Sequence, residues 1–145
     1  TLFEAIATEA LRRINDFNSQ DMANTLWALA CVGWDSHKFF ITFGTAIAEL
    51  LANFTDTQKS QLYIVASYVQ LTWPHVDFPL SRQLESLRSA YTRDETAPSQ
   101  LQGDVSAMIE QLGWNHGTEH RTVEGFSLDL ADPAAKRAIE VDGPS

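Results

Sequence analysis

Three carboxylates near the end of the chain have the types and spacing of a metal-dependent phosphate site. Asp129 lies in a short apolar run at 126–130, and Glu140 and Asp142 lie in a second run at 137–142. Both runs alternate as strands do, so adjacent strands could place Asp129 near Glu140, while Glu140 and Asp142 share a strand face. Two converging carboxylates are how hydrolytic nucleases hold Mg²⁺. The alternatives are carboxylates that contact RNA without catalysis and carboxylates that are solvated or cap a turn.

A second candidate surface lies on a predicted helix over residues 19–32. Beside its apolar face this helix carries a small, polar stripe at spacings of four, four and three, made of Gln20, Asn24, Ala28 and Cys31. In a helical array such a stripe can face a single RNA strand, with amides bonding to base edges, which makes Gln20 and Asn24 candidate RNA contacts. The alternative is that small residues here let the next helix pack closely. Trp27 lies inside the apolar pattern, so we expect it mainly in the core.

Other chemistry has little support in the sequence. His116 and His120 are four apart, but they fall in a glycine-containing loop and a strand start, where a helical metal-binding pair cannot form. No glycine-rich phosphate loop and no Gly-x-Ser-x-Gly motif is present. The single Cys31 is expected to be a small buried apolar group. We therefore expect no metal and no cofactor.

The charge of the chain argues against nucleic acid. Ten basic and nineteen acidic residues give a net charge of −9. Nucleic-acid binders normally carry a basic footprint, because phosphate neutralisation supplies most non-specific affinity. No stretch approaches the roughly 18 consecutive apolar residues of a membrane span, so no membrane partner is expected. Any targeting segment is expected to lie outside these residues.

Apolar residues recur at helical spacing through most of the chain. They predict helices over 2–15, over 19–32 with Ser19 as N-cap, from Asp35 or Ser36 to Phe54, and over 57–72. A short helix is predicted around 80–91, and another is predicted from Ser99 to the residue before Gly113. After Gly113 the period changes from helical to alternating. This change predicts strands over 119–123, 126–130 and 137–142.

The first two helices resemble the next two. At an offset of 37, Leu11, Ile14 and Phe17 match Ala48, Leu51 and Phe54; after a one-residue slip, at 38, Gln20, Leu26 and Ala28 match Gln58, Ile64 and Ala66. Such a period suits a helix-pair unit that buries its face by stacking on its neighbours. An ordinary four-helix bundle is the alternative. The domains predicted are two helical-repeat units over 1–73, a helix and linker over 74–97, and an incomplete α+β module over 98–145.

Two family resemblances accompany these patterns. A resemblance to the octotricopeptide repeats and the related repeats of FAST kinase-like proteins is carried by Phe17-Asn-Ser-Gln-Asp-Met-Ala-Asn-Thr-Leu-Trp-Ala-Leu-Ala30, with Gly33 after it. A resemblance to the first part of a RAP domain is carried by Ser99-Gln-Leu-Gln-Gly-Asp-Val-Ser-Ala107, Phe126-Ser-Leu-Asp-Leu130 and Ala138-Ile-Glu-Val-Asp-Gly-Pro-Ser145. Helical repeats followed by a C-terminal RAP domain is the family order, and this chain keeps it.

The RAP resemblance implies a restriction-endonuclease-like fold, whose catalytic pattern is Asp followed by Glu-x-Lys. Here the position of the lysine holds Asp142, so the group that would position water or stabilise charge is missing. We therefore expect Glu140→Gln to leave RNA binding intact and to remove no cleavage. The resemblance also departs from the family in length, because two repeats are few and the RAP-like part stops early.

The fold expected from these observations is mainly α, with stacked helix-pair repeats followed by a truncated α+β module. The function that the resemblance implies is non-catalytic RNA binding in mitochondrial or chloroplast gene expression, in transcript processing, stability or translation. Its expected partners are single-stranded organellar RNA and other proteins of an RNA-processing or ribosomal complex. The alternatives are a helical protein-interaction scaffold and a metal-dependent RNA nuclease.

Overall fold

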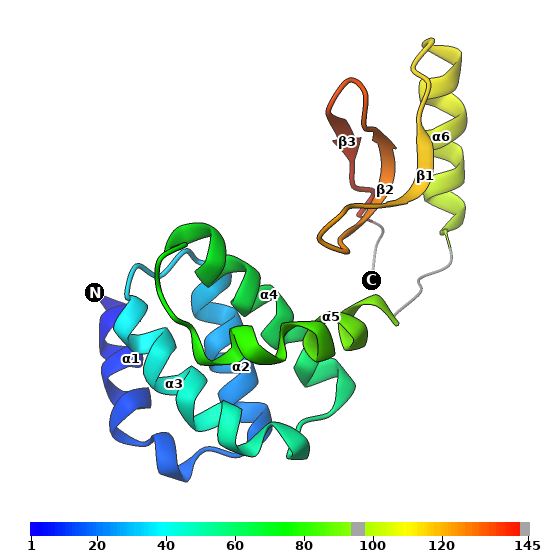
Figure 1. Ribbon diagram of the computed structural model, residues 1–145. Coiled ribbons are helices and arrows are strands. Elements are labelled where there is room, and N and C mark those ends of the chain that lie inside the picture. Colours follow the sequence, from blue (N-terminus) through cyan, green and yellow to red (C-terminus); the bar gives the residue numbers. More distant parts are fainter. Residues whose placement is uncertain (94–97, 143–145) are drawn as a thin grey trace. The chain divides into compact units, whose positions relative to one another are not determined.

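The computed structural model describes residues 1–93 and 98–142, which form parts of two compact units, Thr1–Arg93 and Asp94–Ser145. These described residues are mainly helical, with six α-helices and one small three-stranded sheet (Figure 1). Residues 94–97 of the predicted linker and the last three residues, 143–145, lie outside the described part. None of the described helices combines the length and apolar character that crossing a bilayer requires.

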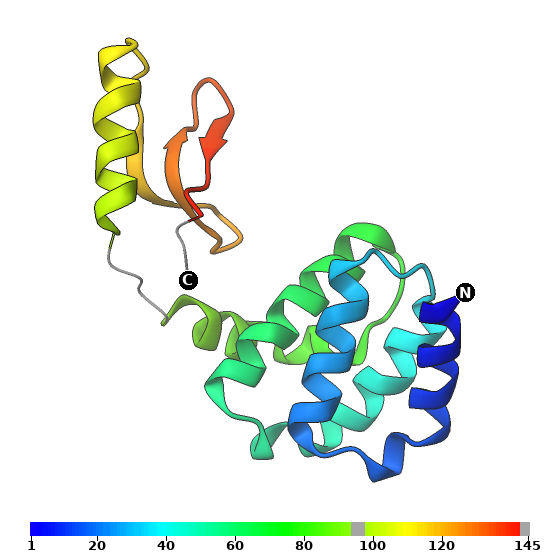
Figure 2. The same ribbon diagram turned by 180° about the vertical axis from the view of Figure 1, so that it is seen from behind.

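The helices of the first unit lie in two layers. Helices α1 (Leu2–Arg12) and α3 (His37–Leu50) pack on each other, and the 3₁₀ helix η3 (Pro79–Gln83) packs on α3 in turn. In the other layer, α4 (Asp56–Thr72) packs between α2 (Ser19–Cys31) and α5 (Leu84–Thr92). Figure 2 shows the same succession from behind. Each described layer therefore grows by adding one helix beside the last.

The order of elements in this unit repeats every 37 residues. Helix α1 leads through η1 (Ile14–Asp16) to α2, and α3 leads through η2 (Leu51–Asn53) to α4. The N-caps Asn18 and Thr55 both form capping boxes, with Asp21 and Gln58 as the reciprocal partners. The predicted N-cap Ser19 is therefore wrong by one residue. The predicted slip to an offset of 38 is also wrong, because both capping boxes align at 37.

The core of the first unit is built around α3. Phe39, Phe40 and Phe43 are all at most 2% exposed, and the rings of Phe39 and Phe43 stack with centroids 4.7 Å apart. Directly after Phe43 on the same helix, a Cβ placed on Gly44 would meet the ring of Phe78 at 2.5 Å. The absence of a side chain at Gly44 lets the segment before η3 lie directly on α3.

Three expectations about burial in the first unit are wrong. Trp27 is 38% exposed and Cys31 is exposed, although the sequence predicts both inside. On α1 the buried residues are Ala7 and Ala10, whereas Leu2 of the predicted apolar stripe is 72% exposed. Leu2 is exposed because nothing in the described residues covers the side of α1 on which it lies. Trp27 and Cys31 lie in line with Gln20 and Asn24 on a solvent-exposed flank of α2, beside its contact with α4.

The second unit consists of α6 (Gln100–Gln111) beside an antiparallel sheet in the order β1-β2-β3. The strands are β1 (Gly117–Arg121), β2 (Ser127–Asp132) and β3 (Arg137–Ile139). The sequence predicted three strands here, but the first begins two residues earlier and the third ends three residues earlier than expected. Leu130, on the central strand, is fully buried.

Helix α6 presents a polar side to the sheet. Gln102 is 5% exposed, and its Nε2 donates to Glu119 Oε1 at 2.8 Å and to the Asp129 carbonyl at 3.1 Å. One turn on, Ser106 Oγ lies 2.8 Å from His116 Nε2. These hydrogen bonds fix which side of α6 faces the sheet. Part of the predicted apolar stripe therefore faces solvent, and Met108 is 66% exposed.

Candidate nucleic-acid interface

Four side-chain amides from α2 and α4 form a hydrogen-bonded group, which we call the amide cluster. Gln20 Nε2 donates to Asn24 Oδ1 at 2.8 Å within α2. Gln58 Nε2 donates to Gln20 Oε1 at 3.0 Å, and Gln61 Nε2 donates to Asn24 Oδ1 at 3.1 Å, both between the two helices. The two residues that the sequence singled out, Gln20 and Asn24, are therefore brought together and joined to two more amides.

Local structure places these amides at the start of each helix. Gln58 accepts the Thr55 N–H at 2.9 Å as part of the capping box, so its side chain is fixed and only 5% exposed. Its amide nitrogen points toward α2, where Gln20 is exposed. The cluster is thus anchored at its α4 side and open to solvent at its α2 side.

The exposed part of the cluster has unused hydrogen-bonding capacity. Asn24 is exposed, and its Oδ1 accepts two bonds, but among the described contacts its Nδ2 donates none. The Oε1 of Gln61 also has no hydrogen-bond partner in the described part of the chain, but it is buried and is not presented to solvent. In the described contacts the exposed Gln20 amide donates one bond and accepts one, so it keeps one N–H and one oxygen lone pair that can pair with a base edge.

Trp27 extends this surface. It lies seven residues after Gln20 and three after Asn24, so the helical repeat places all three along one side of α2. With 38% of its surface exposed, its ring is accessible beside the amides. A partly exposed indole offers a flat face on which an unpaired base can stack. We call the amide cluster together with Trp27 the α2–α4 face.

The carboxylates that the sequence singled out lie in the second unit. The pairing of Leu130 with Ile139 and of Ala131 with Ala138, continued by one residue, sets Asp129 opposite Glu140. Asp129 Oδ2 also accepts the Val141 N–H at 2.7 Å. The structure therefore brings Asp129 and Glu140 together, as adjacent strands were expected to do.

The surroundings of Glu140 raise the pKa of its carboxyl group from the ordinary value. Burial raises the pKa of Glu140, and the neighbouring charge of Asp129 raises it further, with smaller contributions from Asp142 and Glu119. Glu119 itself has a left-handed backbone with φ of 50°, and its carboxylate accepts from Gln102 and from Ser127 Oγ. Protein donors therefore bind the carboxylates of Glu119 and Asp129.

No metal site emerges from this arrangement. Within 1–93 and 98–142, no group of three or more His, Cys, Asp or Glu side chains is placed so that it could hold a metal ion. Asp142 is exposed and adds its charge to the field at Glu140. These residues form a cross-strand pair of carboxylates, and the pKa of Glu140 is raised by burial and by the charge of Asp129.

Sequence reasoning missed three members of the α2–α4 face, which are Gln58, Gln61 and Trp27. Gln61 was not singled out, although the 37-residue offset places it at the position of Asn24. Trp27 was expected mainly in the core because it lies inside the apolar pattern of the helix. The signal that could have found it was its spacing of seven from Gln20, which puts it in the polar stripe.

Comparison with known proteins gives a match to a protein from rice. The chain is 25% identical to the RAP domain-containing protein, chloroplastic, of Oryza sativa subsp. japonica, over 145 aligned positions that cover 90% of this chain and 22% of the relative. The chain thus spans less than a quarter of that relative's length. No family model and no solved structure gives a significant match. The similarity supports a relationship between this chain and a RAP domain-containing protein.

Proposed function

We propose that this chain is a non-catalytic RNA-binding part of an organellar gene-expression factor, and that it holds single-stranded RNA on the α2–α4 face. The observation that carries the proposal is the amide cluster, in which amides from two stacked helices meet beside an exposed tryptophan. The similarity to a RAP domain-containing protein supports the same class of function.

The chemistry of the face matches unpaired bases more closely than it matches a duplex. Sequence-specific RNA recognition targets bases whose edges and rings are free, through amides and aromatic stacking. Asn24 supplies N–H donors that the described contacts leave unused, and Trp27 supplies the ring. In a duplex these edges are paired and the rings are covered.

The acidic charge opposes RNA binding through the phosphates. With a net charge of −9, the chain gains little from phosphate neutralisation, so base contacts must supply most of the affinity. Asp21 lies in the first turn of α2 and accepts the N–H of Asn18 at 3.1 Å in the capping box. Its negative charge therefore stabilises the N-terminus of that helix.

The location proposed is the chloroplast. The relative from rice is described as chloroplastic, and the chain shares 25% of its residues with it over the aligned part. Transcript processing, stability and translation are the organellar steps in which an RNA-binding factor of this kind would act. We place the chain in one of them as a binding component.

The test is a binding measurement with matched amide variants. Fluorescence anisotropy of a labelled single-stranded RNA of mixed sequence is recorded at about 0.15 M salt, where charge repulsion is screened, with the wild-type chain and with Asn24→Ala. We expect the variant to bind more weakly by about 5–10-fold, the loss of roughly one hydrogen bond. Gln70→Ala is the control, because Gln70 is exposed on α4, half a turn around the helix from Gln61.

Each result has a defined meaning. Weaker binding by Asn24→Ala with unchanged binding by Gln70→Ala supports the proposal. Equal weakening by both variants, or no binding by the wild-type chain, contradicts it and leaves the protein-interaction scaffold as the better account. Mg²⁺-dependent cutting of the RNA that disappears in Glu140→Gln would contradict the non-catalytic part of the proposal.

A further inference from the structure

The outer side of α1 and α2 exposes large apolar side chains of the kind that are usually buried. Leu2, Phe3 and Ile6 are 72%, 43% and 44% exposed, whereas the residues 37 positions later, Phe39, Phe40 and Phe43, are 2%, 0% and 0% exposed. On the other helix, Val32 is 52% exposed and Val69 is 1% exposed. The same positions of the repeat are thus buried in the second helix pair and open in the first.

The contacts between the two pairs show what covers these positions. The ring of Phe43 lies edge-on to the ring of Phe17 with centroids 6.0 Å apart. Tyr68 Oη donates to the Trp34 carbonyl at 3.0 Å. Both contacts run from the second pair back to the first. Phe17 lies just before α2 and contacts α3, and Trp34 lies just after α2 and contacts α4.

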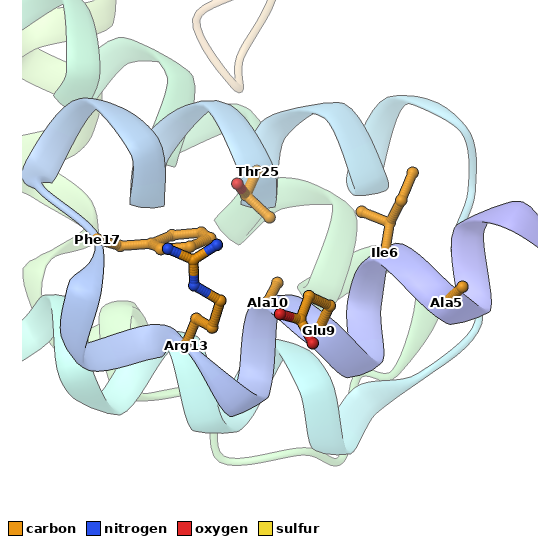
Figure 3. A pocket seen from close by; sticks show the side chains of 7 residues that line it. All are labelled: Ala5, Ile6, Glu9, Ala10, Arg13, Phe17 and Thr25. Atoms are coloured by element: carbon orange, nitrogen blue, oxygen red, sulfur yellow. The ribbon is translucent and has the colours of Figure 1, made fainter.

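The corresponding places on the first pair form a groove. A hollow of about 400 Å³ lies between α1 and α2, lined by Ala5, Ile6, Glu9, Ala10, Arg13, Phe17 and Thr25 (Figure 3). Ile6 stands where the second pair has Phe43, and Thr25 stands where it has the fully buried Leu62. The groove is therefore the counterpart of the place where the two described pairs meet.

We propose that this groove and the outer side of α1 and α2 bind another helix pair of the same repeat, which presents an aromatic residue at the position of Phe17 and Phe54. Both described pairs carry a phenylalanine between the 3₁₀ turn and the N-cap of the second helix. The aromatic residue of the incoming pair rests against Ile6, as Phe17 rests against Phe43. The surface continues the interface that the two described pairs already form.

Cys31 is a natural probe of this interface. It is the only cysteine of the chain and is exposed. It occupies the repeat position of Tyr68, whose hydroxyl reaches back to the preceding pair. An incoming helix pair would therefore cover the Cys31 thiol.

The experiment adds one repeat to the intact chain. A copy of residues 1–37 is placed directly before Thr1, which keeps the 37-residue period, and the copy carries Cys31→Ser so that the original Cys31 remains the only thiol. We expect a thiol reagent to label Cys31 about tenfold more slowly in the extended protein than in the 145-residue chain. The midpoint of urea unfolding of the first unit is expected to rise.

Two controls separate docking from simple extension. A glycine- and serine-rich extension of the same length is expected to leave the labelling rate unchanged. Phe17→Ala within the added copy is expected to restore most of the labelling rate, because it removes the ring that rests against Ile6.

Three results would overturn the proposal. The first is labelling of Cys31 at the same rate with and without the added pair, whether or not that pair is helical. The second is full protection by the pair that carries Phe17→Ala. The third is labelling of the unextended chain that slows as protein concentration rises, which would assign the surface to a second copy of the chain.

Discussion

Asn24 and Gln61 occupy the same position in successive helix pairs, six residues after the N-caps Asn18 and Thr55, and they are joined by a 3.1 Å hydrogen bond. A repeat of 37 residues therefore brings equivalent side chains into contact across two helices. This contact sets the spacing of amides along the layer of α2 and α4. Because the α4 side is fixed by a capping box, the amide cluster has a defined geometry before any ligand arrives.

Trp27→Leu tests the aromatic part of the α2–α4 face. Leucine keeps the apolar character but removes the ring, so single-stranded RNA should bind more weakly by about 1–3 kcal/mol, the contribution of one stacked base. Fluorescence anisotropy measures the change. An oligonucleotide of the same length without bases should bind both proteins equally. If that oligonucleotide also loses affinity, Trp27 does not act by stacking.

Phe40→Ala and Phe3→Ala are a matched pair, because the two residues occupy the same position of the repeat on α3 and α1. Phe40 is fully buried, so its truncation should lower the free energy of unfolding by about 3–5 kcal/mol. Phe3 is 43% exposed, so its truncation should cost less than about 1.5 kcal/mol. Urea unfolding followed by circular dichroism gives both values. Equal losses would show that the outer side of α1 is covered in the isolated chain.

Gly44→Ala and Gly103→Ala should change stability in opposite directions. A Cβ on Gly44 would lie 2.5 Å from the Phe78 ring, so overpacking should destabilise the first unit by about 1–3 kcal/mol. A Cβ on Gly103 meets nothing within 4 Å inside α6, where alanine should be about 0.5–1 kcal/mol more favourable than glycine. The melting temperatures of the two variants, measured by thermal unfolding, test both expected changes in stability. A stabilising Gly44→Ala would contradict the close approach of Phe78 to α3.

Asp129→Asn should lower the pKa of Glu140. Burial is the larger cause of the raised pKa and remains in the variant, whereas the charge of Asp129 is removed. Because the folded state binds this proton more tightly than the unfolded chain, Glu140 disfavours folding above its raised pKa, and that penalty disappears as the pH falls below its usual value of 4.5. The variant should therefore lose less stability as the pH rises through this window.

The measurement for this prediction is the ¹³C chemical shift of the Glu140 carboxyl group as a function of pH. The side-chain amide introduced by Asp129→Asn keeps an oxygen for the Val141 N–H, so the local structure should persist. Asp104→Asn, on the exposed side of α6, serves as the control. An unchanged Glu140 titration in Asp129→Asn would show that the two carboxylates are not in electrostatic contact.

The helices could be predicted from the sequence because their caps and apolar spacing are local signals. The N-cap at Ser99 and the strand run around Leu130 follow from nearest neighbours along the chain. Exposure could not be predicted in the same way. Whether the apolar stripe of α1 is inside depends on which helices lie beside it, and Leu2 is exposed because nothing in the described residues packs there.

Only part of the candidate site could be predicted from the sequence, for a similar reason. Gln20 and Asn24 stand out on one helix by their spacing, but their partners Gln58 and Gln61 are found only when the two helices are aligned in space. The rotation of α6 was not predictable from hydropathy, because the buried Gln102 fixes it through polar contacts with the sheet. Polar contacts of this kind leave no periodic pattern.

Photo-crosslinking of single-stranded RNA that contains 4-thiouridine tests the central claim most directly. The crosslinked peptides are identified by mass spectrometry on the wild-type chain. We predict crosslinks in α2 and the first turns of α4, centred on Asn24 and Trp27, and their loss in Trp27→Leu. Crosslinks confined to the sheet of the second unit, or a pattern unchanged in Trp27→Leu, would contradict RNA binding on the α2–α4 face.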